Sequence, residues 1–313
     1  MRHRWQRATP EIRPTLEDAA RLVAPVLPDA RVLGCAGLAG GLANSNILVT
    51  LAGHPPLVLR FYQRDPAAAP REAAIAARVA LAPRLRHLGN DERYGPYAVV
   101  DWVEGRRLET LPPPAQAGLA GALGRTLAGI HAHRFPATGF FGPALSIAMP
   151  VPVGGDGLVG YLRHCLVDGH GGARLGPELT AGLLAFAETH ASRLDRWDGP
   201  PVLTHSDFNG SNILVATGRI TAVLDWEFAF AGSPFFDFGN ILRPPFGDLP
   251  GVEAAIAAGY RAAGGRLPAN WRQLSLLADL MAWADFVSRP RADAALIADA
   301  RATILTTLRS FPA

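Results

Sequence analysis

The sequence predicts an α+β protein of two lobes, a small antiparallel sheet followed by a larger, mainly helical region. Three observations support this prediction. The first hundred residues alternate short apolar runs with glycine and proline turns, which is typical of strands. After Gly105, apolar residues recur every three or four positions along most of the chain. The 313 residues, 49% of them hydrophobic and 18% charged, are enough to build two packed lobes.

The first lobe is expected to span residues 1–103, with a hinge near 98–103. Thr15 followed by Asp18 resembles a capping box, and apolar spacing predicts a helix over 15–27. Two strands are then predicted on either side of a glycine-rich turn, in VLGCAGLAGGLANSNILVTL. A strand, a helix of strong helix formers and a final strand follow, in PLVLRFY, REAAIAARVALA and YAVVDWVEG.

The second lobe, residues 104–313, is expected to consist of helices joined by loops. Helical periodicity begins in LAGALGRTLAGIHAH, and further helices are predicted at 156–169, 177–192, 252–263, 269–288 and 291–309. Clusters of proline and glycine predict surface loops at 136–155, 171–177 and 244–251. The stretch VLTHSDFNGSNILVATGRITAVLDWEF is the only β-like interruption expected in this half.

The composition argues against several classes of protein. Thirty basic and 27 acidic residues leave a formal charge of only +3, so nucleic acid is not an expected partner. No segment has the apolar length of a membrane span or the layout of a signal peptide. Cys35 and Cys165 fit neither a metal-binding spacing nor a disulfide framework. We therefore expect a cytoplasmic protein without a membrane partner, and its oligomeric state stays open.

Polar side chains gather around the one hairpin predicted in the second lobe. Two strands joined at Gly218 and Arg219 by a type II′ turn would place Asn212 opposite Asp225. An amide oxygen and a carboxylate oxygen side by side suit Mg²⁺ with substrate phosphates. Asp207, on the loop before the first strand, can reach the same place and accept a proton from a substrate hydroxyl.

Each of these residues also has a structural interpretation. Asp and Asn beside strands are most often turn or capping residues, and a chemical role is favoured only because several must be explained together. His205 is expected to brace the loop rather than to catalyse. Asn209 and Glu227 are candidates for contacts near the metal or the acceptor, and Glu227 is alternatively a cap for the following turn.

The segment HSDFNGSN, from His205 to Asn212, and the later LDWE around Asp225 closely resemble the signature of the aminoglycoside phosphotransferase and choline kinase superfamily. These proteins are small-molecule kinases with a protein-kinase-like fold, and the spacing is a variant of the protein-kinase pattern. The resemblance implies a catalytic loop over 205–212, with Asp207 as the base and Asn212 and Asp225 as Mg²⁺ ligands. It also implies ATP, or GTP, as co-substrate and a small hydroxyl-bearing acceptor.

The resemblance also assigns nucleotide-binding roles in the first lobe. Backbone N–H groups of the glycine-rich segment could approach phosphates, at Gly40, Gly41, Asn44 and Ser45. The backbone at the hinge would hydrogen-bond the purine edge, at Asp101, Trp102 and Val103. An ordinary turn and an ordinary core strand describe the same two segments equally well.

Arg60 stands where this fold usually has a phosphate-binding lysine, and Glu72 is placed to pair with it from the following helix. The chain contains no lysine, so an arginine would have to take that role. An arginine offers a planar fork of donors rather than a point charge, so its geometry would differ. In the second lobe, the resemblance assigns Asp237 a structural role, hydrogen-bonding the backbone of the catalytic loop.

The acceptor is not determined by these motifs. Aminoglycosides or other antibiotics, choline-like amino alcohols, sugars, homoserine-like metabolites and hydroxyacyl thioesters all remain open. A cationic acceptor would favour carboxylates at the mouth of the helical lobe, although such residues are equally often solvated: Glu178, Glu188, Asp195, Asp198, Glu227 and Asp248. The missing lysine also raises a second class, a nucleotide-binding protein without activity. A metal-dependent hydrolase would need further ligands that the local sequence lacks.

Overall fold

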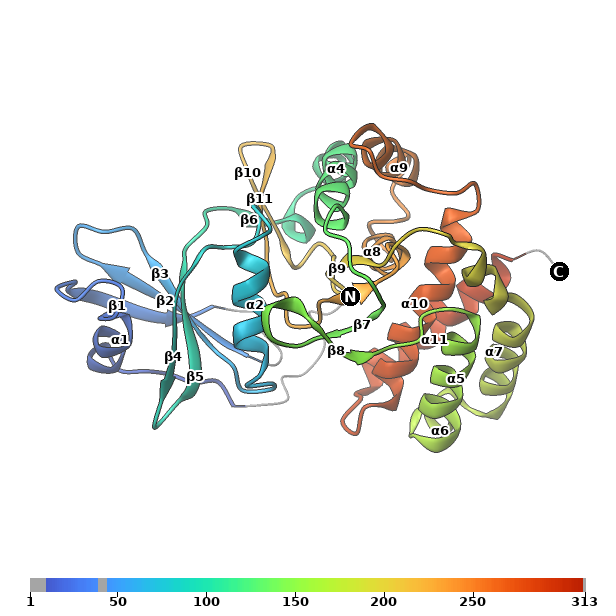
Figure 1. The fold of residues 1–313 in the computed structure, drawn as a ribbon, viewed down its shortest axis with the longest axis horizontal. Coiled ribbons are helices and arrows are strands. Elements are labelled where there is room, and N and C mark those ends of the chain that lie inside the picture. Colours follow the sequence, from blue (N-terminus) through green and yellow to red (C-terminus); the bar gives the residue numbers. More distant parts are fainter. Residues whose placement is uncertain (1–9, 39–43, 312–313) are drawn as a thin grey trace.

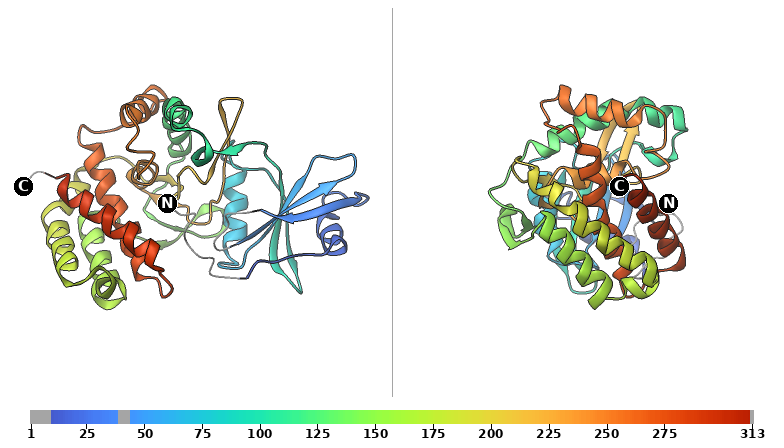
Figure 2. Two further views of the ribbon diagram at one scale, coloured as in Figure 1. Left: turned by 180° about the vertical axis from the view of Figure 1, so that it is seen from behind. Right: turned by 90° about the vertical axis from the view of Figure 1, so that its right-hand side faces the viewer.

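The computed structural model describes residues 10–38 and 44–311 and has two lobes that lie side by side along its longest axis (Figure 1). The smaller lobe contains a five-stranded antiparallel sheet with the strand order β1-β2-β3-β5-β4. The larger lobe is mainly helical, and both views of Figure 2 show helices forming most of it. The predicted α+β class is therefore confirmed.

The smaller lobe begins with the predicted capped helix. Thr15 Oγ accepts a hydrogen bond from the backbone N–H of Asp18, and the Asp18 carboxylate accepts one from the backbone of Thr15. The apolar side of this helix packs on the sheet in one cluster of buried side chains. The elements of this lobe are α1 (Leu16–Val23), β1 (Val32–Gly37), β2 (Ser45–Leu51), β3 (Leu57–Phe61), α2 (Ala68–Ala76), β4 (Leu85–Asp91) and β5 (Gly95–Asp101).

Two features of this lobe differ from the sequence prediction. Helix α2 ends at Ala76 instead of continuing to Ala82, and the residues up to Pro83 form turns. Proline disfavours helical conformation in the residue before it, which works against a longer helix. Strand β4 was not predicted because its sequence, LRHLGND, is polar and lies at the edge of the sheet. Its pairing with β5 supplies the backbone partners that its composition does not suggest.

The larger lobe contains the predicted helices with their ends shifted by a few residues, and three further short helices. Its helices are α3 (Pro113–Gly118), α4 (Ala120–His131), α5 (Gly155–Arg163), α6 (Gly171–Leu175), α7 (Pro177–His190), α8 (Phe235–Ile241), α9 (Val252–Ala262), α10 (Trp271–Ser288) and α11 (Ala294–Arg309). The short helices that were not predicted are α3, α6 and α8. The prediction of a surface loop at 171–177 is wrong, because Gly171–Leu175 form α6, whose Gly171 and Leu175 are buried. Its strands are β6 (Arg106–Arg107), β7 (Gly139–Phe141), β8 (Ile147–Pro150), β9 (Val202–Thr204), β10 (Ile213–Ala216), β11 (Arg219–Val223) and β12 (Phe230–Gly232). No helix in the described ranges is long and apolar enough to cross a membrane.

The expectation of a single β-like interruption in the larger lobe is wrong. Strands β7 and β8, within the predicted loop 136–155, join β12 and β9 in a sheet with the order β8-β7-β12-β9. These strands are only three or four residues long and are flanked by proline and glycine, so they have too little local pattern to be recognised. The sheet matters for the site because β9 leads directly into the predicted catalytic loop.

The predicted register of the β10–β11 hairpin is also wrong. Ala216 pairs with Arg219, so Thr217 and Gly218 form the two-residue turn, and both have positive φ, 48° and 71°. Two positive φ angles define a type I′ turn, not the predicted type II′. The register shifts between Leu214 and Val215, as in a β-bulge, and β11 ends at Val223. The residue opposite Asn212 is consequently Leu224, not Asp225.

Helices α4 and α9 pack at close range, and glycines make this possible. A Cβ on Gly124 would lie 2.1 Å from the carbonyl oxygen of Ile256, and one on Gly259 would lie 2.1 Å from that of Gly121. The packing aligns His131 at the end of α4 with Tyr260 near the end of α9, and their side chains hydrogen-bond at 3.0 Å. These two residues reach toward the catalytic loop, as described below.

We expect Gly124→Ala to lower the free energy of unfolding by about 1–3 kcal/mol, the usual cost of overpacking. The matched control is Gly129→Ala on the same helix, where an added Cβ would meet nothing within 4 Å. That change should be neutral or stabilising by up to about 1 kcal/mol because alanine has the higher helix propensity. Urea unfolding of both variants checks the prediction, and equal effects would contradict the close packing.

Candidate active site

A pocket between the two lobes is lined by most of the predicted nucleotide-binding residues. One part is apolar, with side chains from both lobes: Val58, Ala76, Leu85, Val100, Leu214 and Leu224. The residues expected at the hinge, Asp101, Trp102 and Val103, border it. The polar side chains include Asn46, Arg60, Glu72, Asn212 and Asp225. A pocket with an apolar part and a cluster of charged side chains suits a ligand that has a flat ring and a charged group.

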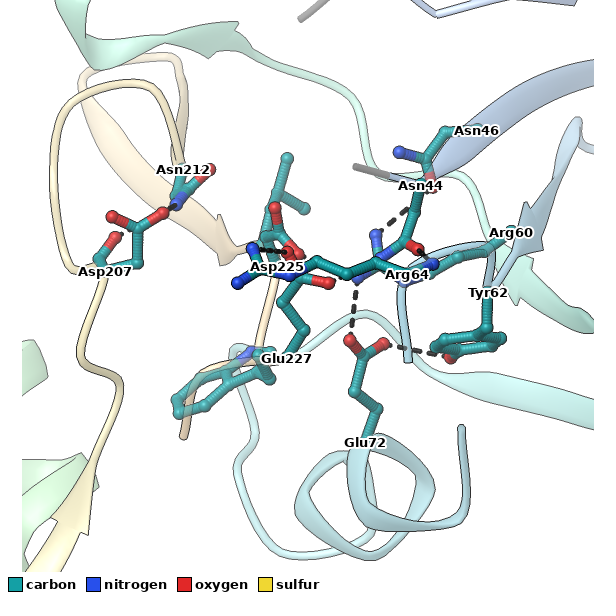
Figure 3. Close-up of polar contacts among 12 residues, drawn as sticks. Asn44, Asn46, Arg60, Tyr62, Arg64, Glu72, Asp207, Asn212, Asp225 and Glu227 are labelled. Atoms are coloured by element: carbon teal, nitrogen blue, oxygen red, sulfur yellow. Dashed lines mark hydrogen bonds and ion pairs between the residues drawn. The ribbon is translucent and has the colours of Figure 1, made fainter. Parts of the chain in front are cut away.

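Arg60 joins the two lobes across this pocket (Figure 3). Its Nη2 atom lies 2.7 Å from Glu72 Oε1 on α2 and 2.7 Å from Asp225 Oδ1 in the larger lobe. The Arg60 and Glu72 side chains are only 10% and 11% exposed, whereas Asp225 is 31% exposed. Burial lowers the pKa of Arg60, but Glu72 and Asp225 outweigh it and raise that pKa above its ordinary value. Arg60 therefore stays cationic.

Two side chains that sequence reasoning missed complete this cluster. Tyr62 donates a hydrogen bond to Glu72 Oε2 at 2.9 Å, and Asn46 Oδ1 lies 3.4 Å from Arg60 Nη1. Tyr62 directly follows β3 and is two residues after Arg60, and Asn46 is the register partner of Arg60 on β2. Alternation along a strand and cross-strand pairing place all three on one face of the sheet. The two-residue alternation of side chains along a strand was the sequence signal that could have identified Tyr62 and Asn46.

Asp207 is held by two asparagines. Its Oδ1 accepts a hydrogen bond from Asn209 Nδ2 and its Oδ2 accepts one from Asn212 Nδ2, both at 2.8 Å. Asn212 Nδ2 also donates to the backbone carbonyl of Asp207 at 2.9 Å. Asp207 is 1% exposed and does not line the pocket, but Asn212 does. Asn212 thus connects the Asp207 carboxylate to the edge of the pocket.

His205 is completely buried and both of its ring nitrogens are engaged. The backbone N–H of Asp207 donates to Nδ1, and Nε2 lies 2.8 Å from the carbonyl oxygen of Leu224. Nδ1 must therefore accept while Nε2 donates, which requires the neutral imidazole. The ring also packs on Trp226, with centroids 4.5 Å apart. His205 links the start of the catalytic loop to the residue before Asp225.

Asp237, in the first turn of α8, binds the backbone of the catalytic loop. Its carboxylate accepts hydrogen bonds from the backbone N–H groups of His205 and Ser206 at 2.9 and 2.7 Å. Ser206 has a positive φ of 62°, so its conformation needs such support. Behind Asp237 lies His131, at 3.0 Å, and then Tyr260. Sequence reasoning placed His131 on a helix but had no signal for this contact.

We expect Asp237→Ala to lower the free energy of unfolding by about 3 kcal/mol, because buried donors lose a charged acceptor. Tyr260→Phe is the matched control, since it removes only the hydrogen bond at the far end of the chain of contacts and should cost about 1 kcal/mol. Urea unfolding measures both. Similar losses in the two variants would show that Asp237 does not support the loop as its contacts indicate.

Asn212 and Asp225 have side-chain oxygens that could hold a divalent cation. Asn212 donates through Nδ2, which leaves its Oδ1 as the atom for a ligand, and Asp225 faces the pocket from a backbone with a φ of 64°. Within the described residues, no group of three or more His, Cys, Asp or Glu side chains is placed to hold a metal. A hard cation such as Mg²⁺ fits this donor set, because it binds few carboxylates and takes its other oxygens from phosphates and water.

The remaining predicted residues lie around the pocket rather than in its lining. Asn44 Nδ2 donates to Glu227 Oε2 at 2.7 Å, which ties the base of the glycine-rich turn to the larger lobe. Burial, and to a smaller extent the nearby negative charge of Asp225, raise the pKa of Glu227 to about 7. Ser45 Oγ donates to Gln63 Oε1 at 2.6 Å. Gly40 and Gly41 lie outside the described residues.

Several carboxylates considered for a cationic acceptor have other partners. Glu188 pairs with Arg163, Asp198 lies 2.9 Å from Arg266, and Asp195 accepts a hydrogen bond from the backbone N–H of Gly155. The Glu188 and Asp198 pairs are exposed at the surface. Exposed ion pairs of this kind contribute little stability. They give no sign of an acidic pocket in the helical lobe.

Comparison with known proteins agrees with this geometry. The model of the phosphotransferase enzyme family matches residues 34–277. The comparison with curated proteins found no match. Among solved structures, a mutant of the aminoglycoside phosphotransferase APH(4)-Ia in a ternary complex with ADP and hygromycin B is 18% identical, with a TM-score of 0.72. That match covers 94% of this chain and 98% of the other.

Two further structures are similar in fold. The macrolide 2′-phosphotransferase MphH of Brachybacterium faecium is 20% identical with a TM-score of 0.66, over 92% of this chain and 97% of the other. A GDP complex of an aminoglycoside 2′-phosphotransferase-IIIa mutant is 17% identical with a TM-score of 0.69, over 94% and 97%. These similarities confirm the predicted two-lobed, protein-kinase-like fold. With a family model that matches well over half of its residues, the chain belongs to the phosphotransferase enzyme family.

Proposed function

We propose that this protein is a Mg²⁺-dependent kinase that transfers the γ-phosphate of ATP, or alternatively of GTP, to a hydroxyl of a small molecule. The observation that supports this proposal is the meeting of Arg60 and Asp225 at the pocket with Asn212, which in turn holds Asp207. Each lobe supplies part of this arrangement. Family membership supports the reaction type.

The nucleotide would lie in the pocket between the lobes, whose border we propose near residue 103. The backbone of Asp101, Trp102 and Val103 would bind the purine edge, and the apolar side chains would enclose the ring. The glycine-rich turn, including Gly40 and Gly41, would cover the phosphates with its backbone N–H groups. Two similar structures are complexes with ADP and with GDP, and this supports either nucleoside diphosphate as the product. An ATP donor favours a cytoplasmic protein.

Phosphoryl transfer needs positioning and neutralisation of charge more than covalent work by the protein. Asn212 and Asp225 would hold Mg²⁺, which when bound would neutralise charge on the nucleotide phosphates. Arg60 would steady those phosphates. Asp207 would orient the acceptor hydroxyl and accept its proton, and Asn209 and Asn212 fix the direction of its two oxygens. Asp237 and His205 would keep the loop in this shape.

The acceptor is proposed to be an aminoglycoside or another antibiotic, because two similar structures are described as phosphotransferases of aminoglycosides and macrolides. The alternative is a metabolite such as choline, a sugar or homoserine. The test is the formation of ADP or GDP with a panel of these acceptors, with and without Mg²⁺. Turnover with one acceptor and its loss with EDTA are expected. Nucleotide-induced thermal stabilisation without turnover on any acceptor would instead favour a binding protein without activity.

A further inference from the structure

The Arg60 guanidinium contacts one of the two oxygens of Asp225, the carboxylate proposed to bind the metal. Figure 3 shows this side chain between Glu72 and Asp225, and its Nη2 atom lies 2.7 Å from Asp225 Oδ1. Asp225 is the one carboxylate in the proposed pair of metal ligands. In this state of the protein its negative charge is therefore partly balanced by a buried cation, which it shares with Glu72.

A divalent cation bound at Asp225 would lie close to this guanidinium. Mg²⁺ binds a carboxylate oxygen at about 2.1 Å, whereas the arginine nitrogen is within hydrogen-bond distance of the same carboxylate. Like charges a few ångströms apart in a partly buried site repel strongly. Metal binding at Asp225 is thus opposed as long as Arg60 stays in place and no further negative charge is present.

Arg60 also has hydrogen-bonding capacity that its present partners do not use. Its Nε is buried without a hydrogen-bond partner among the described residues, and its Nη1 is a long 3.4 Å from Asn46 Oδ1. Lysine has one charged nitrogen, but arginine offers five N–H groups in a planar fork that matches phosphate oxygens. A phosphate in the pocket would supply both the acceptors for the fork and the negative charge that the metal needs.

We propose that Arg60 is an internal counter-ion of the metal site, paired with Asp225 before nucleotide binds and transferred to the phosphates afterwards. The proposal rests on the proposed function, since it requires Asp225 to be a metal ligand. It assigns Arg60 a second role beyond holding phosphate. Divalent metal alone binds weakly, and metal and nucleotide bind together with positive cooperativity.

The test is Mn²⁺ binding without nucleotide, measured by electron paramagnetic resonance, so it does not depend on turnover. Arg60→Met is expected to bind Mn²⁺ at least about tenfold more tightly than the wild type, because it removes the competing charge. The same variant should bind Mn²⁺-ADP more weakly. Adding Asp225→Ala to Arg60→Met should abolish the gain in Mn²⁺ affinity.

Arg64→Met is the matched control, because it removes the same charge nearby. Arg64 is 42% exposed, lies 4.0 Å from Glu227 and stacks on Phe228, but is not paired with Asp225. An equal gain in Mn²⁺ affinity in Arg64→Met would overturn the proposal in favour of a general change in charge. If loss of the Arg60 charge leaves Glu72 unpaired and unfolds the protein, Arg60→Met is combined with Glu72→Gln.

Failure of this inference can be distinguished from failure of the proposed function. If wild type and Arg60→Met bind Mn²⁺ equally, and Asp225→Ala still weakens Mn²⁺-ADP binding, the counter-ion role is wrong and the metal assignment stands. If Asp225→Ala has no effect on Mn²⁺-ADP binding, the metal assignment itself is wrong, and the counter-ion role is lost with it.

Discussion

Replacing Asp207 by alanine is expected to lower kcat by about 10²- to 10⁴-fold, the usual contribution of a positioned general base. Affinity for nucleotide should change little, because Asp207 is buried behind Asn212 and does not line the pocket. The loss should therefore appear in kcat rather than in nucleotide binding. Steady-state kinetics with the identified acceptor and calorimetric titration with ADP measure the two effects separately.

Asn209→Ala is the matched control for Asp207→Ala. Asn209 contacts Asp207 Oδ1, the oxygen opposite the one that Asn212 holds, so its removal leaves the carboxylate present but less restrained. We expect a loss of kcat of about tenfold, corresponding to one hydrogen bond. If Asp207→Ala retained near-normal turnover, or lost no more than Asn209→Ala, the assignment of Asp207 as the base would be wrong.

Asp225→Ala is expected to lower both turnover and the affinity for metal-nucleotide, by about 10- to 100-fold in affinity. It removes one of the two proposed protein ligands and leaves Arg60 paired with Glu72. Because Asp225 is 31% exposed, unfolding stability should fall less than in Asp237→Ala. Titration of ADP with and without Mg²⁺ shows whether the loss depends on the metal.

The control for Asp225→Ala is Glu227→Gln, which changes a carboxylate two residues further along the chain. Glu227 is buried and does not line the pocket, whereas Asp225 does. Glutamine also keeps an oxygen that can accept the hydrogen bond of Asn44. The loss of metal-nucleotide affinity should thus be much smaller. Equal losses in the two variants would contradict Asp225 as the specific ligand.

Local patterns predicted the parts of this fold that depend on local physics. The capping box at Thr15 and the long helices were predicted because side-chain hydrogen bonds and apolar spacing act within one or two turns. The short strands β7 and β8 were missed because only pairing with β12 makes them strands. The hairpin register was wrong because the bulge at Leu214 and the positive φ of Thr217 break the regular count of residues.

The sequence by itself determined the chemistry available to this protein: the spacing of Asp207, Asn212 and Asp225, and an arginine where no lysine exists in the chain. The tertiary structure alone decided which of these groups meet. Arg60 contacts Asp225 across 165 residues of chain, and His131 reaches Asp237 across 106. Local spacing carries no information on such contacts, because they form only when separately folded elements pack together and bury their charges as partners.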